Sequence, residues 1–81
     1  MNDLGTNILA VMENSNLGEM SVHILHKQSK DIGIDLDNIT ERDVNTLIKQ
    51  LSDILPFFLG DETREVLAKI RRYADNGMAV V

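Results

Sequence analysis

The sequence predicts an all-α fold, a small bundle of four short helices with one extended connecting segment. Two observations point to this class. Over most of the chain, apolar residues recur at three- and four-residue spacing, which places them on one face of a helix. Hydrophobic residues make up 43% of the chain but include only two Phe, one Tyr and no Trp, which suits interdigitated helices better than an aromatic-rich β-sandwich.

The first helix is expected from about Asp3 to Glu13, before the turn-forming residues Asn14-Ser15-Asn16. Gly5 lies in its first turn and weakens its start. One side of this helix carries the apolar residues Leu4, Ile8, Val11 and Met12.

The second helix is expected to begin at Asn16, a good N-cap residue with Glu19 three positions later, and to end near Gly33. Its apolar face would consist of Leu17, Met20, Ile24 and Leu25. Beyond it, the strict alternation from Ile32 to Leu36 is typical of extended backbone. Because one strand makes no sheet, we interpret it as an extended loop that directs Ile32, Ile34 and Leu36 toward the core.

The third helix has the clearest start in the chain. Thr40 can act as its N-cap, Asp43 can reach back to the cap as in a capping box, and Ile39 and Val44 occupy the positions of a hydrophobic staple. From Glu41 to Leu59 one apolar stripe follows, made of Val44, Leu47, Ile48, Leu51, Ile54, Leu55, Phe58 and Leu59.

Pro56 interrupts this stripe, because proline lacks the amide that would bond to Ser52 and clashes with that carbonyl. The helix therefore either kinks or stops at Leu55 and restarts with Pro56 in a first turn; either way Gly60 ends it. The fourth helix, capped by Gly60 or Asp61, is expected to stop at Asp75-Asn76-Gly77. Its apolar side would contain Val66, Leu67, Ile70, Tyr73 and Ala74.

Length and charge narrow the function classes. The 81 residues predict one helical domain over residues 1–81, with room for one small core. There is no Cys for a disulfide or a thiolate zinc site, no signal-like leader, and no apolar run of the roughly 18 residues that a membrane span needs. We therefore expect a cytoplasmic protein without a membrane partner. The net charge of −5 disfavours polyanionic partners.

Two clusters could suggest metal sites. Glu19, His23 and His26 have the spacing of a two-His, one-carboxylate site, but they fall opposite the apolar face of their helix, where solvated side chains are expected. A set of acidic residues follows in Asp31, Asp35, Asp37, Glu41 and Asp43. Its spacing fails the EF-hand pattern, which needs a Gly at the sixth position and a Glu at the twelfth. No metal is predicted.

The stretch Gly33-Ile34-Asp35-Leu36-Asp37 is similar to one in acyl carrier proteins, which are also small acidic four-helix domains. Those proteins carry Asp-Ser-Leu at the start of their second helix, and this chain does not, so the resemblance implies no phosphopantetheine site. The chain also lacks a nucleophile motif and a phosphate-binding glycine loop. We predict no enzyme activity, no cofactor and no small-molecule ligand.

Basic residues gather in the fourth helix as Arg64, Lys69, Arg71 and Arg72. They could contact phosphates, which makes a nucleic-acid-associated regulator the alternative hypothesis. The same helix carries Glu62 and Glu65, no aromatic side chain is expected among the cations, and cations near a helix C-terminus complement the helix dipole without any ligand.

The favoured hypothesis is a non-enzymatic interaction module, an adaptor or regulatory protein that binds another protein or itself through an apolar helix face. If the third helix ran through Pro56, Phe57 would fall on its polar side. Two interpretations are open: a kink at Pro56 turns Phe57 inward, or Phe57 belongs to a second apolar surface that a partner covers. A homodimer is predicted. The expected interface residues are Phe57, Phe58, Leu59 and Leu67.

Overall fold

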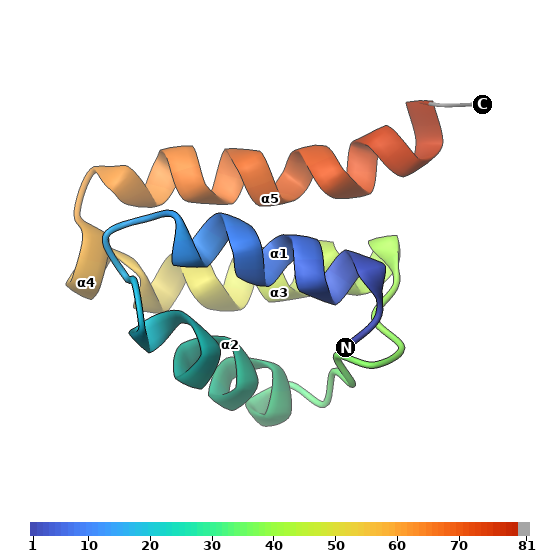
Figure 1. Ribbon diagram of the computed structural model, residues 1–81, viewed down its shortest axis with the longest axis horizontal. Helices are drawn as coiled ribbons and strands as arrows, with labels where there is room; N and C mark the ends of the chain where they lie inside the picture. Colours follow the sequence, from blue (N-terminus) through green and yellow to red (C-terminus); the bar gives the residue numbers. More distant parts are fainter. Residues whose placement is uncertain (80–81) are drawn as a thin grey trace.

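The computed structural model describes the backbone of residues 1–79 and the side chains of residues 1–74. This part of the chain is all helical and has no strand, as predicted (Figure 1). The helices are α1 (Asp3–Glu13), α2 (Met20–Asp31), α3 (Glu41–Ile54), α4 (Pro56–Leu59) and α5 (Glu62–Ala79).

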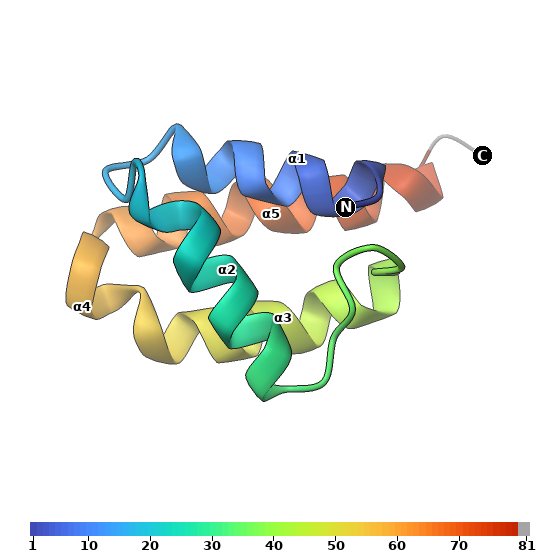
Figure 2. The same cartoon turned by 60° about the horizontal axis from the view of Figure 1, so that its bottom comes forward.

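The helices form a small bundle with extents of 36 × 23 × 20 Å. Helices α1, α3 and α5 lie along its long axis. Helices α1 and α3 run in the same direction, and α5 runs antiparallel to both (Figure 1). The largest packing interface joins α3 to α5, and α1 packs against α5 and α2. Helix α2 crosses the others obliquely (Figure 2). Within residues 1–79, no helix combines the length and apolar character that crossing a bilayer requires.

The core lies between these helices and is built from aliphatic side chains, as the composition indicates. Its fully enclosed members come from α1, α2, α3, α5 and the residue that joins α3 to α4. The largest are Ile8, Met12, Leu25, Leu47, Leu51, Leu55 and Ile70. The apolar stripe of the third helix faces inward as predicted at Val44, Leu47, Ile48, Leu51 and Leu55. Ile54 is only half-buried, and the prediction was wrong for Phe58, which lies beyond the proline break and is exposed.

The start of α3 confirms the predicted capping box. The Thr40 hydroxyl accepts from the Asp43 amide at 3.4 Å, and the Asp43 carboxylate accepts from the Thr40 amide at 3.1 Å. At its other end α3 stops at Ile54, and the chain restarts with Pro56 as the first residue of α4. Of the two alternatives at the proline, the structure therefore shows the restart. Gly60, at φ 54°, then ends the turn as predicted.

The start of the second helix differs from the prediction. Helix α2 begins at Met20, not at Asn16, because residues 14–19 form turns that need Gly18 in the left-handed region at φ 53°. The backbone amide of Asn16 instead donates to Glu62 Oε1 at 3.0 Å, which ties this turn to the start of α5. Helix α2 ends at Asp31, just before Gly33.

The buried face of α2 is also rotated from the predicted one. It consists of Ser21, Ile24, Leu25, Gln28 and Ser29. The prediction was wrong for Met20, which is 48% exposed. Two of the inward positions hold serine, and a third holds Gln28, whose amide oxygen accepts from Gln50 Nε2 of α3 at 2.7 Å. Because polar residues fill these positions, the spacing of the apolar residues alone misplaces the buried face of α2.

The connection between α2 and α3 carries Ile32, Ile34 and Leu36 against the core, as expected. It contains turns at residues 32–33 and 36–37 and is therefore not extended throughout. The N-terminus closes over it: Asn2 caps α1 by accepting from the Gly5 amide at 2.9 Å and donates through its side chain to the Ile39 carbonyl at 2.9 Å. This cap explains how α1 begins at Asp3 despite the glycine.

Helix α5 is longer than predicted and continues through residues 75–77 to Ala79. An Asn-Gly pair ends a helix only where the glycine takes the left-handed conformation, and here the backbone of Gly77 is helical. Val66, Ile70 and Ala74 are buried as expected. Tyr73 was predicted on the same face but is 40% exposed, because it lies beside the buried stripe and not within it.

Candidate functional site

The most exposed large apolar side chains of the described part of the chain lie on α4. Phe57 is 86% exposed and Phe58 is 49% exposed. Leu55, directly before α4, is fully buried, and two residues further along a helix is about 200° around its axis, so Phe57 points away from the core. Because α4 is a single turn packed on the core through one side only, its opposite side, with Phe57, lies in solvent.

The four predicted interface residues do not share one environment. Phe57 and Phe58 are exposed, whereas Leu59 and Leu67 are half-buried and pack against the core. Leu59 follows Leu55 by four residues, which brings both to the inner side of the chain. The exposed apolar surface at this end therefore consists of the two phenylalanines and does not include the leucines.

Two further apolar side chains, Met20 and Val22 at the start of α2, are exposed, and sequence reasoning missed one of them, Met20. The start of α2 lies at the same end of the bundle as α4 (Figures 1 and 2). We call the exposed pair Phe57 and Phe58 the end surface. The pattern of α2 could have revealed the exposure of Met20 and Val22, because inward positions that begin at Ser21 leave the residues on either side of it outside.

A hollow of about 490 Å³ lies beside the end surface. It forms where Gly60 turns the chain from α4 into α5, and it is lined by Pro56, Gly60, Asp61, Thr63 and Arg64. Asp61 and Arg64 are exposed and bear opposite charges, and neither belongs to an ion pair found among the described residues. The Thr63 hydroxyl is buried without a hydrogen-bond partner in this part of the chain.

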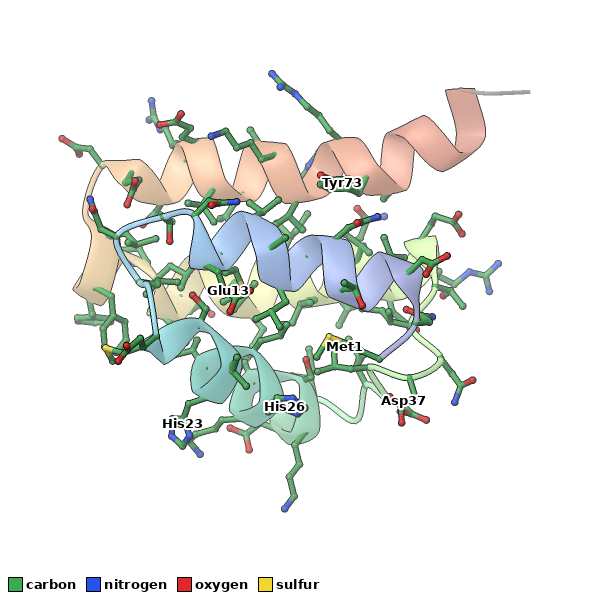
Figure 3. All side chains as sticks on the ribbon, viewed as in Figure 1. Met1, Glu13, His23, His26, Asp37 and Tyr73 are labelled. Atoms are coloured by element: carbon green, nitrogen blue, oxygen red, sulfur yellow. The ribbon has the colours of Figure 1, made fainter. Side chains whose placement is uncertain are left out.

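The histidines of α2 lie on its solvent face. His23 and His26 are exposed and line a shallow hollow together with Lys27, Lys30 and Asp31 (Figure 3). Two lysines at this position oppose a metal cation. Among the residues that the structure describes, no three His, Asp or Glu side chains are grouped to hold a metal ion.

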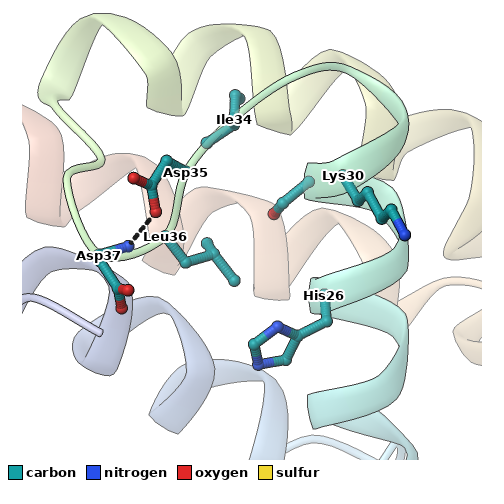
Figure 4. Close-up of a pocket in the computed structure, with 7 residues that line it drawn as sticks. His26, Lys30, Ile34, Asp35, Leu36 and Asp37 are labelled. Carbon is teal, nitrogen blue, oxygen red and sulfur yellow. Dashed lines mark hydrogen bonds between the residues drawn. The ribbon is translucent and has the colours of Figure 1, made fainter.

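The acidic residues of the connection before α3 have structural partners. The Asp35 carboxylate accepts from the Asn38 side chain at 2.8 Å and from the Asp37 amide at 2.9 Å (Figure 4). Chiefly through the Asn38 bond, and secondly through the Asp37 amide, the pKa of Asp35 is held below its ordinary value. Asp37 Oδ1 lies 2.7 Å from the amino group of Met1. These carboxylates stabilise turns and chain ends.

A third hollow, of about 320 Å³, lies between this connection and α2 (Figure 4). His26 and Lys30 of α2 stand on one side, and Asp35, Leu36 and Asp37 of the connection lie across from them. Its charges are mixed and its carboxylates already accept hydrogen bonds, so the hollow does not select a ligand of one charge.

The basic residues of α5 have an aromatic neighbour that was not expected from the sequence. Lys69, Arg72 and Tyr73 line a hollow of about 280 Å³ together with Val11 of α1. Lys69 also lies 3.3 Å from Glu65, an exposed pair of small energetic weight. Tyr73 lies on α5 far from α4 (Figure 3), so this basic surface is separate from the end surface.

Comparison with known proteins identifies no relative: no family model, curated protein or solved structure matches the chain.

Proposed function

We propose that this protein is a small non-enzymatic interaction module, an adaptor or regulator of the cytoplasm, that binds another protein or a second copy of itself through the end surface. The observation that carries the proposal is the 86% exposure of Phe57 on a helix of a single turn. Fully burying such a side chain is worth about 1.5–3 kcal/mol, so a partner that covers it gains affinity from this residue alone.

The setting of Phe57 also supports binding. Aromatic side chains that sit in the centre of a contact dominate the energetics of most interfaces. Pro56 fixes the start of α4 and the buried Leu55 anchors it, so Phe57 is presented with little backbone freedom to lose. Phe58, the next residue along the chain, is also exposed and adds to the apolar area.

Site-specific photo-cross-linking in the source cell tests this proposal. A photoreactive phenylalanine analogue at position 57 is expected to give one discrete cross-linked product, whose mass identifies the partner. The same analogue at position 73 replaces another exposed aromatic residue far from α4 and serves as the matched control. Absence of a discrete product at position 57, with the protein folded, refutes the use of this surface.

The second candidate is a nucleic-acid-associated regulator, and the position of Tyr73 beside Lys69 and Arg72 favours it. A base can stack on an exposed tyrosine while the neighbouring cations contact phosphates. Retention on heparin at physiological salt, reduced in Tyr73→Ser and Arg72→Ala but not in Phe57→Ser, would support this candidate. Under the first proposal a protein of net charge −5 passes through the column.

A further inference from the structure

The end surface lies next to the hollow along the chain, so a projection and a recess are neighbours. Phe57 is the projection, at 86% exposure. Pro56, the residue before it, lines the recess together with Gly60, which lies four residues later and hence on the same side of the turn. The recess of about 490 Å³ has room for an aromatic ring.

The charges at the recess are self-complementary. Asp61 and Arg64 both line it and bear opposite charges, and neither is among the ion pairs within the described residues. In a two-fold symmetric interface the same patch meets itself, so that a residue i contacts j of the other copy and j contacts i. A patch with one acid and one base of this kind can satisfy both charges against its own copy.

We propose that the partner bound by the end surface is a second copy of this chain, in a two-fold dimer where Phe57 of each copy enters the recess of the other. Asp61 of each copy then faces Arg64 of the other. This inference rests on the proposed function and names its partner. It also replaces the predicted contact with Leu67, since that side chain already packs against the core of its own chain.

Charge favours a second copy over a partner surface that carries an excess of one sign. A partner surface with an excess of one sign would leave either Asp61 or Arg64 against a like charge, which costs affinity. A second copy supplies one charge of each sign in a fixed geometry. The apolar contact of Phe57 then provides affinity, and the two charge pairs determine the register.

Mass measurement in solution is the first test. Light scattering from low to several hundred micromolar should show a mass that rises from 9.1 kDa toward twice that value. Phe57→Ser should remain monomeric over the same range, whereas Tyr73→Ser should dimerise like the unmodified chain. A mass of one chain at every concentration overturns the inference. If the chain stays monomeric but position 57 cross-links to another protein, the dimer is refuted and the proposed function still stands, so failure of the one is distinguishable from failure of the other.

Charge reversal tests the geometry itself. Asp61→Arg alone places two arginines against each other at both pairs, and Arg64→Asp alone places two aspartates there, so each variant should raise the dimer dissociation constant roughly tenfold or more. An equimolar mixture should form a heterodimer, because each pair then joins an arginine to an aspartate. Arg71→Asp, about 10 Å further along α5, is the matched control and should dimerise normally.

Both substituted side chains are exposed, and far-UV circular dichroism checks that the variants fold. Asp61→Asn and Arg64→Gln provide milder versions that remove a charge pair without repulsion, and they should weaken the dimer less than the reversals. A dimer that resists both reversals, or a mixture in which no heterodimer forms, overturns the proposed exchange.

Discussion

Leu51→Ala measures how much of the stability depends on the interface between α3 and α5. Leu51 lies on α3, its side chain is fully buried, and it belongs to the central core cluster. The substitution removes three buried carbons, worth about 2.4 kcal/mol at roughly 0.8 kcal/mol each. The cavity left behind raises the expected loss to about 3–5 kcal/mol. For 81 residues the total stability is on the order of 4–12 kcal/mol, so the variant is close to unfolding.

Urea denaturation followed by circular dichroism gives the difference in the free energy of unfolding. Heating offers a second readout, since a loss of 3 kcal/mol lowers the melting temperature of a domain of this size by about 12–24 °C. Ser52→Ala is the matched control: its side chain is exposed one residue away, and its effect should stay within about 0.5 kcal/mol. A loss below about 1 kcal/mol for Leu51→Ala would show that the apolar stripe of α3 is not enclosed.

Three local substitutions test smaller features. Thr40→Ala should lower the free energy of unfolding by about 1 kcal/mol through the lost cap, and an unchanged urea midpoint would mean that the cap contributes nothing. Gly5→Ala should destabilise by about 1–3 kcal/mol, because the new Cβ would lie 2.9 Å from the Leu36 carbonyl oxygen. A more stable variant, as helix propensity alone predicts, would contradict that close approach. Asn38→Ala should raise the pKa of Asp35 in an NMR titration; the stabilisation from the lowered pKa is present above the unfolded-state pKa and lost as pH falls through the folded-state pKa. An unmoved Asp35 titration would rule out the Asn38 bond as its main cause.

The helical fold and the details of α3 could be predicted from the sequence, because they depend on neighbours within one or two turns. The capping box of Thr40 and Asp43 is formed by residues three positions apart, and the missing amide of Pro56 acts on the turn that contains it. The inward stripe through Leu51 follows from helical periodicity alone. The same local rules left two positions for Phe57, inward or exposed, and the structure shows it exposed on the restarted helix.

Rules of this kind fail where a distant segment sets the outcome. Asn16 has the chemistry of an N-cap, yet Gly18 turns the chain there and Glu62, 46 residues away, accepts its amide. Met20 and Tyr73 were assigned to buried faces, but both lie at the edges of those faces, where the orientation of the neighbouring helix decides between core and solvent.

The sequence by itself determined an all-helical chain, the capped start and proline break of its third helix, and an aliphatic core, since each follows from local hydrogen bonding or from helical periodicity. Only the tertiary structure decided that Met20 and Tyr73 lie on the solvent side of their helices, and that the Asn16 amide meets Glu62 at the start of α5. Surfaces assembled from separate helices depend on how those helices cross, and crossing geometry is the sum of many side-chain contacts that no single segment encodes.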